Sequence, residues 1–511
     1  MPRRAGLLAR LIVVPTVIAA GVLVAPQSEA RATDQSYWVP VDSTLTVVGH
    51  GFGHGHGMSQ YGAEGAAHQG LTAAQILAFY YPGTTMATGA GSVRVLISGD
   101  ADNDVVVLPA TGLLVRDVGT GKAYPLPALA GVKQWRLSLV KGKEQLSYLK
   151  SAWTAYAPGG LTALVGDGQF EAPQPLTLVT GSGNRAYRGA LRLASPGAGA
   201  STRATVNVLS MDNYIKGVVP REMPASWLPA AVQAQAIAAR TYAVWSRNQN
   251  PNRYYQLCDT TSCQVYGGLG AEDPRSNAAV DATQGKILTW QGSAVFAQFS
   301  SSSGGFTSAG NVPYLVAKAD PYDDFSGNPV HDWTIRVSSH VLEKAYPAIG
   351  RLRRIRVTSR VDGGDWSGRV GTVVLDGTKA DRTVSGDTMR SLLGLRSTYF
   401  TISPTRIMAR WAAIGGSASV VGSPLAREYA RKGGVAQNFS KGRIFYRTGA
   451  ASAFEMYGPM LTAYVAAGGS GGRLGMPMSP PKAEPGGTWA TFQHGVIHYV
   501  AATRKAVVTY R

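Results

Sequence analysis

"MDNYIKGVVPREMPASWLPAAVQAQAIAARTYAVWSR", residues 211–247, is the stretch of the sequence that decides the fold. After Pro224 it becomes rich in alanine and glutamine, and it contains no glycine through Arg247. Ser226 is a candidate N-cap, and Pro229 is acceptable in a first helical turn. We therefore predict a helix over about 227–246, whose small residues would allow close packing against a sheet.

The sequence on both sides of this helix is typical of strands and turns. Residues 92–210 contain short β-type runs such as "SVRVLIS" and "TVNVLS", separated by Gly, Pro, Asp and Asn, and residues 264–397 return to the same pattern. A shorter stretch, "LTAAQILAFYYPGT", has helical spacing and ends at Pro82. We predict an α+β fold, with a strand-rich region packed around one principal helix and followed by a small repeat domain.

The C-terminal part of the sequence repeats itself from about residue 406. "WAAIGGSASVVGSP" begins at Trp411, and "YVAAGGSGGRLGMP" begins at Tyr464. Seven residues of the first copy recur 53 positions later: Gly415, Gly422, Pro424, Phe439, Gly442, Ile444 and Tyr446. One register held over so many positions indicates a duplicated module at 406–511.

Residues 1–32 resemble a secretory signal peptide, with a basic start, an apolar run over 11–25 and small residues before Thr33. The alternative is an uncleaved anchor, although the run is shorter than the ~20 residues of a membrane span. The net charge of +19 favours an acidic neighbour. Outside the cell, anionic cell-wall polymers or a membrane surface are better candidates than nucleic acid, which we do not expect as a partner. The charge could also serve solubility alone.

Two cysteines, Cys258 and Cys263, stand close together in "QLCDTTSCQVYGG". In an oxidising compartment the simplest expectation is a disulfide that closes a tight loop. Half of a metal site is the alternative, but it would need two further ligands, and no histidine lies between Met86 and Val330. We predict a disulfide, no metal and no cofactor.

A glycine-histidine segment, "GHGFGHGHGMSQYGAEG", occupies residues 49–65. A phosphate-binding role is unsupported because the segment has no lysine. His50, His54 and His56 could bind a metal, yet no Cys or carboxylate stands at a matching offset. The preferred interpretation is a tight loop whose histidines form hydrogen bonds.

Two further stretches offer reactive groups. Glu222 stands just before Pro224 and the predicted helix start, where it could be a general acid with a raised pKa or could simply favour the helix N-terminus. "FSSSSGGFT", residues 299–307, offers hydroxyls but lacks the GxSxG context of a serine nucleophile, so polar turn chemistry is the better interpretation. His331 is expected to be an ordinary loop histidine.

Together these segments resemble the SpoIID/LytB family of stage II sporulation protein D and amidase enhancers. The similarity rests on "GHGHGMSQYGA" and "YIKGVVPREMPASWLPAAVQAQAIAARTYA", with "CQVYGG", "SSGGFT" and "ILAFYYPGT" in support, and spans about 45–395. "VVGSP" and "LGMP" resemble LGFP repeats, which are associated with cell-wall proteins. The resemblance divides the chain into a catalytic region and two LGFP-like repeats. The catalytic region is 33–397, in parts 33–90, 92–210 and 211–397, and the repeats are 406–511.

The resemblance implies a secreted, wall-associated lytic transglycosylase that cleaves MurNAc–GlcNAc bonds of peptidoglycan glycan strands, with Glu222 as its catalytic residue. It also implies a set of residues that bind the glycan: His54, Ser59, Gln60, Arg240, Gln264, Tyr266, Ser303, Gly304 and Gly305. The alternative within the family is a non-catalytic protein that enhances a wall amidase. A third possibility is a structural wall protein that binds through its repeats alone.

The sequence departs from the family pattern in three ways. The glycine-histidine motif precedes Glu222 instead of following it, so residues 49–65 must fold back beside that carboxylate. Ser300 stands where the family often has histidine. Some members bind zinc through a histidine and two cysteines, but here no nearby upstream histidine accompanies the cysteines.

Overall fold

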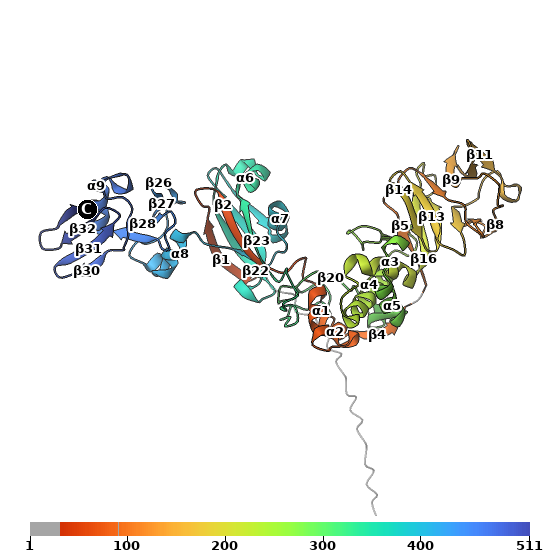
Figure 1. Ribbon diagram of the computed structural model, residues 1–511, viewed down its shortest axis with the longest axis horizontal. Helices are drawn as coiled ribbons and strands as arrows, with labels where there is room; N and C mark the ends of the chain where they lie inside the picture. The colour runs from red at the N-terminus through yellow and green to blue at the C-terminus, as the bar shows by residue number, and fades with distance from the viewer. Residues whose placement is uncertain (1–30, 90) are drawn as a thin grey trace, which may run out of the picture.

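The computed structural model describes residues 31–89 and 91–511 of the chain. Its parts lie in a row, with the C-terminal repeats at one end and a strand-rich region at the other (Figure 1). The expected signal segment lies outside the described residues except for Arg31 and Ala32, which begin strand β1. Among the described residues, no helix combines the length and apolar character needed to cross a bilayer.

Helices gather at the centre of the molecule (Figure 1). They are α1 (Gln60–His68), α2 (Ala73–Tyr80), α3 (Met211–Glu222), α4 (Pro229–Gln249) and α5 (Pro274–Ala282). The principal helix predicted over 227–246 is α4, and the helix predicted before Pro82 is α2. Ser226 is not the N-cap of α4, which begins after Leu228 without a side-chain cap. Instead, Glu64 accepts a hydrogen bond from the Leu228 amide at 3.0 Å.

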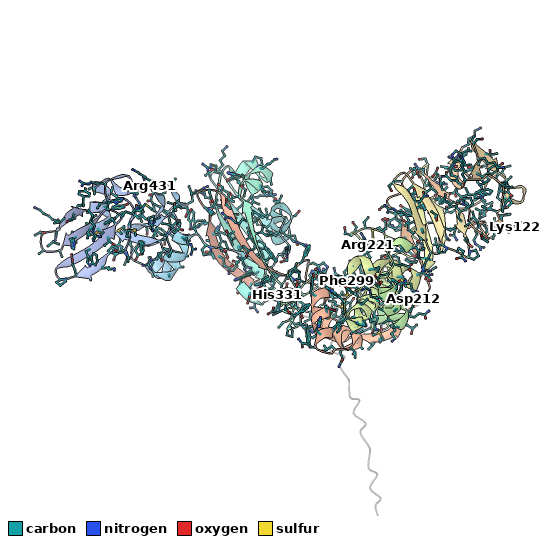
Figure 2. All side chains as sticks on the ribbon, in the orientation of Figure 1. Lys122, Asp212, Arg221, Phe299, His331 and Arg431 are labelled. Carbon is teal, nitrogen blue, oxygen red and sulfur yellow. A yellow bond between two sulfur atoms is a disulfide. The ribbon has the colours of Figure 1, made fainter. Side chains whose placement is uncertain are left out.

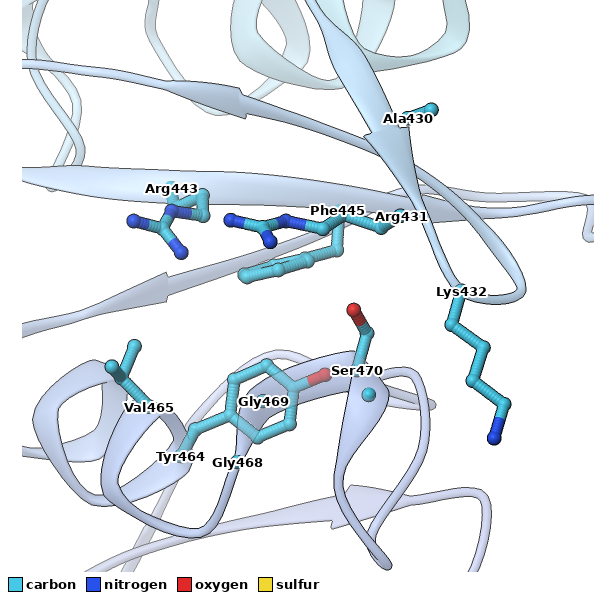
Figure 3. A pocket seen from close by; sticks show the side chains of 11 residues that line it. Ala430, Arg431, Lys432, Arg443, Phe445, Tyr464, Val465, Gly468, Gly469 and Ser470 are labelled. Atoms are coloured by element: carbon cyan, nitrogen blue, oxygen red, sulfur yellow. The ribbon is translucent and has the colours of Figure 1, made fainter.

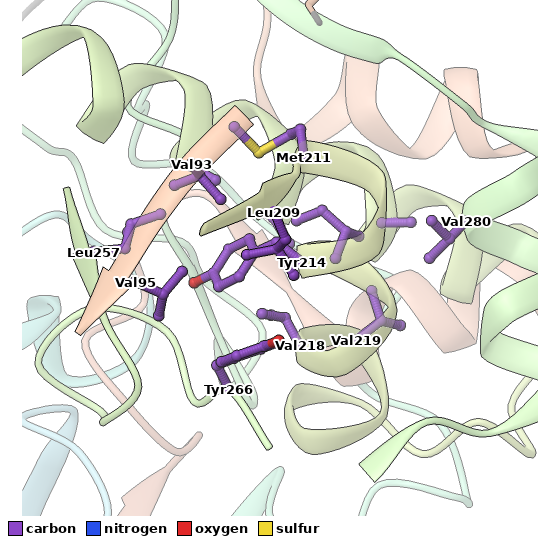
Figure 4. Packing of buried hydrophobic residues seen from close by; sticks show 14 of the residues in the cluster. Val93, Val95, Leu209, Met211, Tyr214, Val218, Val219, Leu257, Tyr266 and Val280 are labelled. Atoms are coloured by element: carbon purple, nitrogen blue, oxygen red, sulfur yellow. The ribbon is translucent and has the colours of Figure 1, made fainter. Parts of the chain in front are cut away.

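Helix α3 was not predicted as a separate helix. Ser210 caps its start by accepting from the Asn213 amide, and the extended Met223 ends it. Pro224 explains that end, because the residue before a proline avoids the helical region. Figure 4 shows Tyr214 and Val218 of α3 packed among Val93 and Val95 of the neighbouring strand.

Two antiparallel sheets form the strand-rich region. The larger has the order β17-β5-β16-β15-β12-β7-β8, and the smaller has the order β11-β10-β9-β6-β13-β14. Only the pairing of the short β17 with β5 is parallel in the larger sheet. The strands of the larger sheet are β5 (Ser92–Leu96), β7 (Leu114–Asp117), β8 (Ala123–Pro125), β12 (Gly168–Glu171), β15 (Ala190–Ala194), β16 (Ala204–Ser210) and β17 (Leu257–Cys258). Those of the smaller sheet are β6 (Asp104–Val107), β9 (Gln134–Val140), β10 (Lys143–Leu149), β11 (Trp153–Tyr156), β13 (Leu176–Thr180) and β14 (Gly183–Tyr187).

The chain builds another module from its first strands and a distant segment. β1 and β2 precede the glycine-histidine loop, yet β1 pairs with β22, and β2 pairs with β21 and β25. A separate apolar core, with Val47, Trp333 and Phe400 among its members, fills this module. Its elements are β1 (Arg31–Trp38), β2 (Thr44–His50), β21 (Asp332–Ser338), α6 (His340–Ala345), β22 (Leu352–Val361), β23 (Arg369–Gly377), β24 (Asp381–Ser385), α7 (Gly386–Leu393) and β25 (Phe400–Ile402).

Short strands connect the loop after β2 to the central helices. β3 and β20 pair in parallel, with Met58 opposite Phe299, and β18 pairs with β4 and β19. Their bounds are β3 (Met58–Ser59), β4 (Thr85–Thr88), β18 (Lys286–Trp290), β19 (Ser293–Ala294) and β20 (Phe299–Ser300). The predicted α+β class is confirmed by this mixture of helices and mainly antiparallel sheets.

The two C-terminal repeats have the same architecture, each a helix followed by a four-stranded antiparallel sheet. The first contains α8 (Arg406–Ala413), β26 (Tyr429–Arg431), β27 (Gly434–Asn438), β28 (Gly442–Arg447) and β29 (Phe454–Tyr457). The second contains α9 (Gly458–Ala466), β30 (Lys482–Glu484), β31 (Gly487–Phe492), β32 (Gly495–Val500) and β33 (Lys505–Tyr510).

Equivalent hydrogen bonds recur in both repeats. Trp411 donates to the Gly422 carbonyl at 2.8 Å, and Tyr464, 53 positions later, donates to the Gly475 carbonyl at 2.7 Å. The duplication predicted from the sequence is therefore present in the structure.

Candidate active site

Glu222 is the last residue of α3, not a residue at the start of a helix. The sequence-based alternative, in which its charge favours a helix N-terminus, is therefore wrong. The C-terminal end of a helix carries partial negative charge, which disfavours a carboxylate. The position of Glu222 consequently favours the protonated side chain.

The surroundings of Glu222 also favour its protonated side chain. Burial raises the pKa of this carboxyl group, and only partial compensation comes from a hydrogen bond and from Arg221. The hydrogen bond is donated by the Val265 amide to Oε1 at 2.9 Å. Glu222 thus remains a proton donor at a higher pH than an exposed glutamate would.

Glu222 opens into a pocket of about 400 Å³. Its described lining comes from the glycine-histidine loop, the end of α3, helix α4, the segment around the cysteines and the segment before β20. The lining residues are His54, Glu222, Tyr242, Thr261, Ser262, Cys263, Gln264, Val265, Phe296, Ala297, Gln298 and Phe299. Glu222 is the one carboxylate among them. In Figure 2, the labelled Arg221 and Phe299 mark this central region.

The glycine-histidine loop folds back to the pocket, as the unusual motif order requires. Its glycines bring the backbone close to residues 298–304. Gly57 has φ +66°, and a Cβ there would lie 2.1 Å from the Gln298 carbonyl oxygen. At Gly51, with φ +69°, a Cβ would lie 2.7 Å from the Ser302 carbonyl oxygen. Only glycine fits such positions.

His54 is the histidine that lines the pocket. Burial first, and then the charges of His56 and Arg369, lower the pKa of His54 to about 3, so its imidazole is neutral at ordinary pH. Its Nδ1 accepts a hydrogen bond from the His56 amide at 2.9 Å. In a neutral ring the proton then belongs on Nε2. His54 is therefore an uncharged polar group on the pocket wall, and its ring also forms a hydrogen bond with the Phe299 backbone.

Gln60 connects the loop to the catalytic candidate. Its Nε2 donates to the main-chain carbonyl of Glu222 at 3.0 Å and to Gln235 Oε1 at 3.3 Å. Gln60 is buried and is not among the pocket-lining residues. The structure thus places Gln60 behind Glu222, where its hydrogen bond holds the Glu222 backbone.

Most other predicted glycan-binding residues lie in the interior. Ser59, Arg240, Tyr266 and Ser303 are buried, and, with Gly304 and Gly305, they are absent from the pocket lining. Arg240 pairs with Asp212 at 2.7 Å, and Tyr266 donates to Asn207 at 2.8 Å. Gln264 does line the pocket, although it is buried and its Oε1 accepts from Tyr214 at 3.3 Å.

A buried carboxylate, Asp323, explains the serine-glycine motif. It accepts hydrogen bonds from Ser59 at 2.5 Å, Ser302 at 2.8 Å and the Gly304 amide at 3.0 Å. His331 also bonds to it, at 2.9 Å. Burial alone would raise the pKa of Asp323, but these hydrogen bonds lower it below its usual range. Ser59 and Ser302 therefore anchor two loops to Asp323.

The cysteines form the disulfide Cys258–Cys263. Cys263, with the exposed Thr261 and Ser262, lines one side of the pocket, so the crosslink holds that rim. The other histidines of the loop have partners of their own: His50 lies 2.6 Å from Asp332, and His56 stacks on His54 at 5.0 Å. Within residues 31–89 and 91–511, no three metal-ligating side chains gather as a metal site would need.

Sequence reasoning missed the aromatic side chains that line the pocket, which are Tyr242, Phe296 and Phe299. Tyr242 and Trp245 are three residues apart on α4 and therefore share one face. Phe296 contacts both, with ring centroids at 5.7 Å from Tyr242 and 4.3 Å from Trp245. All three rings are partly exposed. Their helical spacing was readable, but nothing in the sequence showed that Phe296 would join them.

Comparison with known proteins supports the resemblance found in the sequence. Residues 200–290 match the SpoIID family model, described as Stage II sporulation protein. The predicted resemblance to the SpoIID family is confirmed. The SpoIID match includes Glu222, Gln264 and the disulfide but not the glycine-histidine loop. Residues 421–472 match the LGFP repeat.

Relatives agree with this result. An amidase enhancer of Bacillus subtilis (strain 168) is 42% identical over 135 residues, which are 25% of this chain and 17% of that protein. The stage II sporulation protein D of Bacillus amyloliquefaciens is 31% identical over 217 residues, which are 38% of this chain and 61% of that protein. The chain therefore spans less than two thirds of the length of each of these SpoIID-related proteins.

Proposed function

We propose that this protein acts in the cell wall as a peptidoglycan lytic transglycosylase, with Glu222 as its general acid and base. The observation that carries the proposal is a single partly buried carboxylate, with a raised pKa, in a pocket lined by three aromatic rings. Glycosidases that use water need a second carboxylate to serve as nucleophile or to activate the water. A transglycosylase that uses a hydroxyl of its own substrate needs only one.

The proposed reaction has two proton transfers at Glu222. The protonated carboxyl group donates its proton to the glycosidic oxygen, and the bond between that oxygen and C1 of MurNAc breaks. The resulting carboxylate then takes the proton from the C6 hydroxyl of the same MurNAc, and O6 bonds to C1. The product is a 1,6-anhydro sugar, no water is consumed, and Glu222 is protonated again.

The neighbours of Glu222 suit both steps. Its raised pKa keeps the acid form populated. The Val265 amide stabilises the carboxylate formed after the first transfer, since the hydrogen bond is to the charged oxygen. Neutral His54 does not repel the positive charge that develops at C1. Tyr242, Phe296 and Phe299 give sugar rings an apolar surface.

Wall association is the broader part of the proposal. The SpoIID and LGFP matches and the net charge of +19 support a secreted protein retained among anionic wall polymers. Peptide-free glycan strands would be the substrate, by analogy with the sporulation relatives.

A second candidate function comes from the relative named amidase enhancer, whose aligned segment is 42% identical. In that case the pocket would bind glycan without cleaving it, and the partner would be a wall amidase.

One experiment separates the two. Purified protein is incubated with peptide-free glycan strands, and the products are identified by mass spectrometry. The transglycosylase proposal predicts 1,6-anhydro ends. Intact strands, together with faster peptide release when an amidase and complete peptidoglycan are supplied, would favour the enhancer.

A further inference from the structure

A second pocket, of about 430 Å³, lies between the two C-terminal repeats. The first repeat contributes Arg431, Lys432, Arg443 and Phe445, and the second contributes Tyr464 and the glycine-rich loop 468–471. Figure 3 shows both guanidinium groups and the Phe445 ring on one side, with Tyr464 and Ser470 on the other. Cations and aromatic rings therefore face the same space, which we call the inter-repeat cleft.

The positive charge of the cleft is not neutralised by the protein. Residues 406–511 contain thirteen lysine and arginine residues, three glutamates and no aspartate. Each glutamate has another partner: Glu428 accepts from the Val41 amide, Glu455 pairs with Arg410, and Glu484 pairs with His498. No carboxylate among the described residues forms an ion pair with the three cations of the cleft. Their mutual repulsion would be relieved by an anionic ligand.

The two arginines are oriented as an anion site requires. Arg443 Nε donates to Asn438 Oδ1 at 2.8 Å, and Tyr429 donates to the same oxygen at 2.9 Å. Arg431 lies over the Tyr429 ring, 4.7 Å from its centroid. These contacts leave the terminal nitrogens of both guanidinium groups available, and such groups bind carboxylate or phosphate with paired hydrogen bonds.

The fold of the repeat does not require these cations. The residues 53 positions after Arg431, Lys432 and Arg443 are Glu484, Pro485 and Val496, although the second repeat has the same architecture. A structural role in the repeat would have preserved the residue type in both copies. The cations instead occur only in the copy that faces the glycine-rich loop of its neighbour.

We propose that the inter-repeat cleft binds an anionic sugar unit of a wall polysaccharide. Arg431, Lys432 and Arg443 would hold its carboxylate or phosphate, above a floor formed by the buried rings of Phe445 and Tyr464. The inference deepens the proposed wall association and rests on it. It names the ligand class and the residues, independently of the chemistry at Glu222.

The test uses the full chain and measures binding by titration calorimetry, with no peptidoglycan glycan present. Oligogalacturonate supplies the carboxylate probe, poly(glycerol phosphate) the phosphate probe, and methyl-esterified oligogalacturonate the neutral control. We expect one anionic probe or both to bind, more weakly as salt increases, and the neutral control not to bind. The probe that binds with the higher affinity identifies the anionic group, carboxylate or phosphate, that the cleft recognises. Equal binding of the neutral control, or no binding of either anion, would overturn the proposal.

Arg431→Gln/Lys432→Gln is the decisive variant, because both side chains are exposed. Thermal unfolding checks that the variant is folded. We expect it to weaken binding about tenfold or more. Arg504→Gln/Lys505→Gln is the matched control, because it removes an equally exposed Arg-Lys pair outside the cleft. An equal loss in both variants would show a diffuse charge effect and no site. Because the assay contains no cleavable glycan, its result is distinct from failure of the transglycosylase proposal.

Discussion

Gln60 donates a hydrogen bond to the main-chain carbonyl of Glu222 at 3.0 Å, and this contact joins the glycine-histidine motif to the motif that contains Glu222. Gln60 begins α1 directly after the glycine-histidine loop, whereas Glu222 ends α3. The reversed order of the motifs is therefore compatible with one site. Gln60 contacts the backbone of Glu222, and His54 lines the same pocket as the Glu222 side chain.

Replacing Gln60 with alanine should lower kcat with little change in KM, since Gln60 positions Glu222 without lining the pocket. A misplaced catalytic group can cost about tenfold to a hundredfold in rate. Steady-state kinetics on peptide-free glycan measures kcat and KM separately. If KM rises while kcat is preserved, Gln60 contacts the glycan after all.

Gly57→Ala should destabilise the protein by about 2–4 kcal/mol, because positive φ and a clash with the Gln298 carbonyl act together. Gly70→Ala is the matched control, as Gly70 also has positive φ, +84°, but nothing lies within 4 Å of its would-be Cβ. The control should cost only about 1–2 kcal/mol. Urea unfolding measures the free energy of unfolding of both variants. Equal losses of stability would contradict the close packing of the loop on residues 298–304.

Glu222→Gln should change stability in a pH-dependent manner. The folded-state pKa of Glu222 is raised, so its ionised form is less favourable in the folded protein than in the unfolded chain. The wild type therefore loses stability as the pH rises above the ordinary glutamate pKa, and the glutamine variant does not. We expect similar melting temperatures near pH 4 and a higher one for the variant at pH 8. A variant that is less stable at pH 8 would indicate a structural role for the carboxylate.

Removing the disulfide with Cys258→Ser/Cys263→Ser should loosen the pocket rim formed by Thr261, Ser262 and residue 263. The loop is short, so the chain-entropy contribution is about 2 kcal/mol. We expect KM for glycan to rise more than kcat falls, because the proposed catalytic carboxylate, Glu222, belongs to another segment. Unchanged KM would show that this rim does not contact the glycan.

The sequence predicted the helices and the repeats better than the roles of single polar residues. Helical spacing and a 53-residue period are local properties, so α2, α4 and the duplicated module could be recognised directly. Ser59, Arg240 and Ser303 stand in the motifs on which the resemblance rests. A motif, however, does not show which of its side chains face the pocket. Their carboxylate partners Asp323 and Asp212 stand outside the blocks on which the resemblance rests.

The position of Glu222 at a helix end was missed for a similar reason. Pro220 and Gly217 disfavour a helix when propensity alone is considered. In the structure, Gly217 packs so closely against Tyr266 that a Cβ would lie 2.5 Å from its ring. This contact joins two residues that are far apart in the sequence. It stabilises α3 at a point where the helix propensity of the residues does not.

The central claim is that Glu222 performs both proton transfers, and product analysis of Glu222→Gln tests it most directly. Wild type and variant are incubated with the same peptide-free glycan strands, and 1,6-anhydro ends are counted by mass spectrometry. The account predicts such ends from the wild type and at least a thousandfold fewer from the variant, about the loss expected when a group needed in both steps is removed. Equal release of 1,6-anhydro ends by a folded Glu222→Gln protein would contradict it.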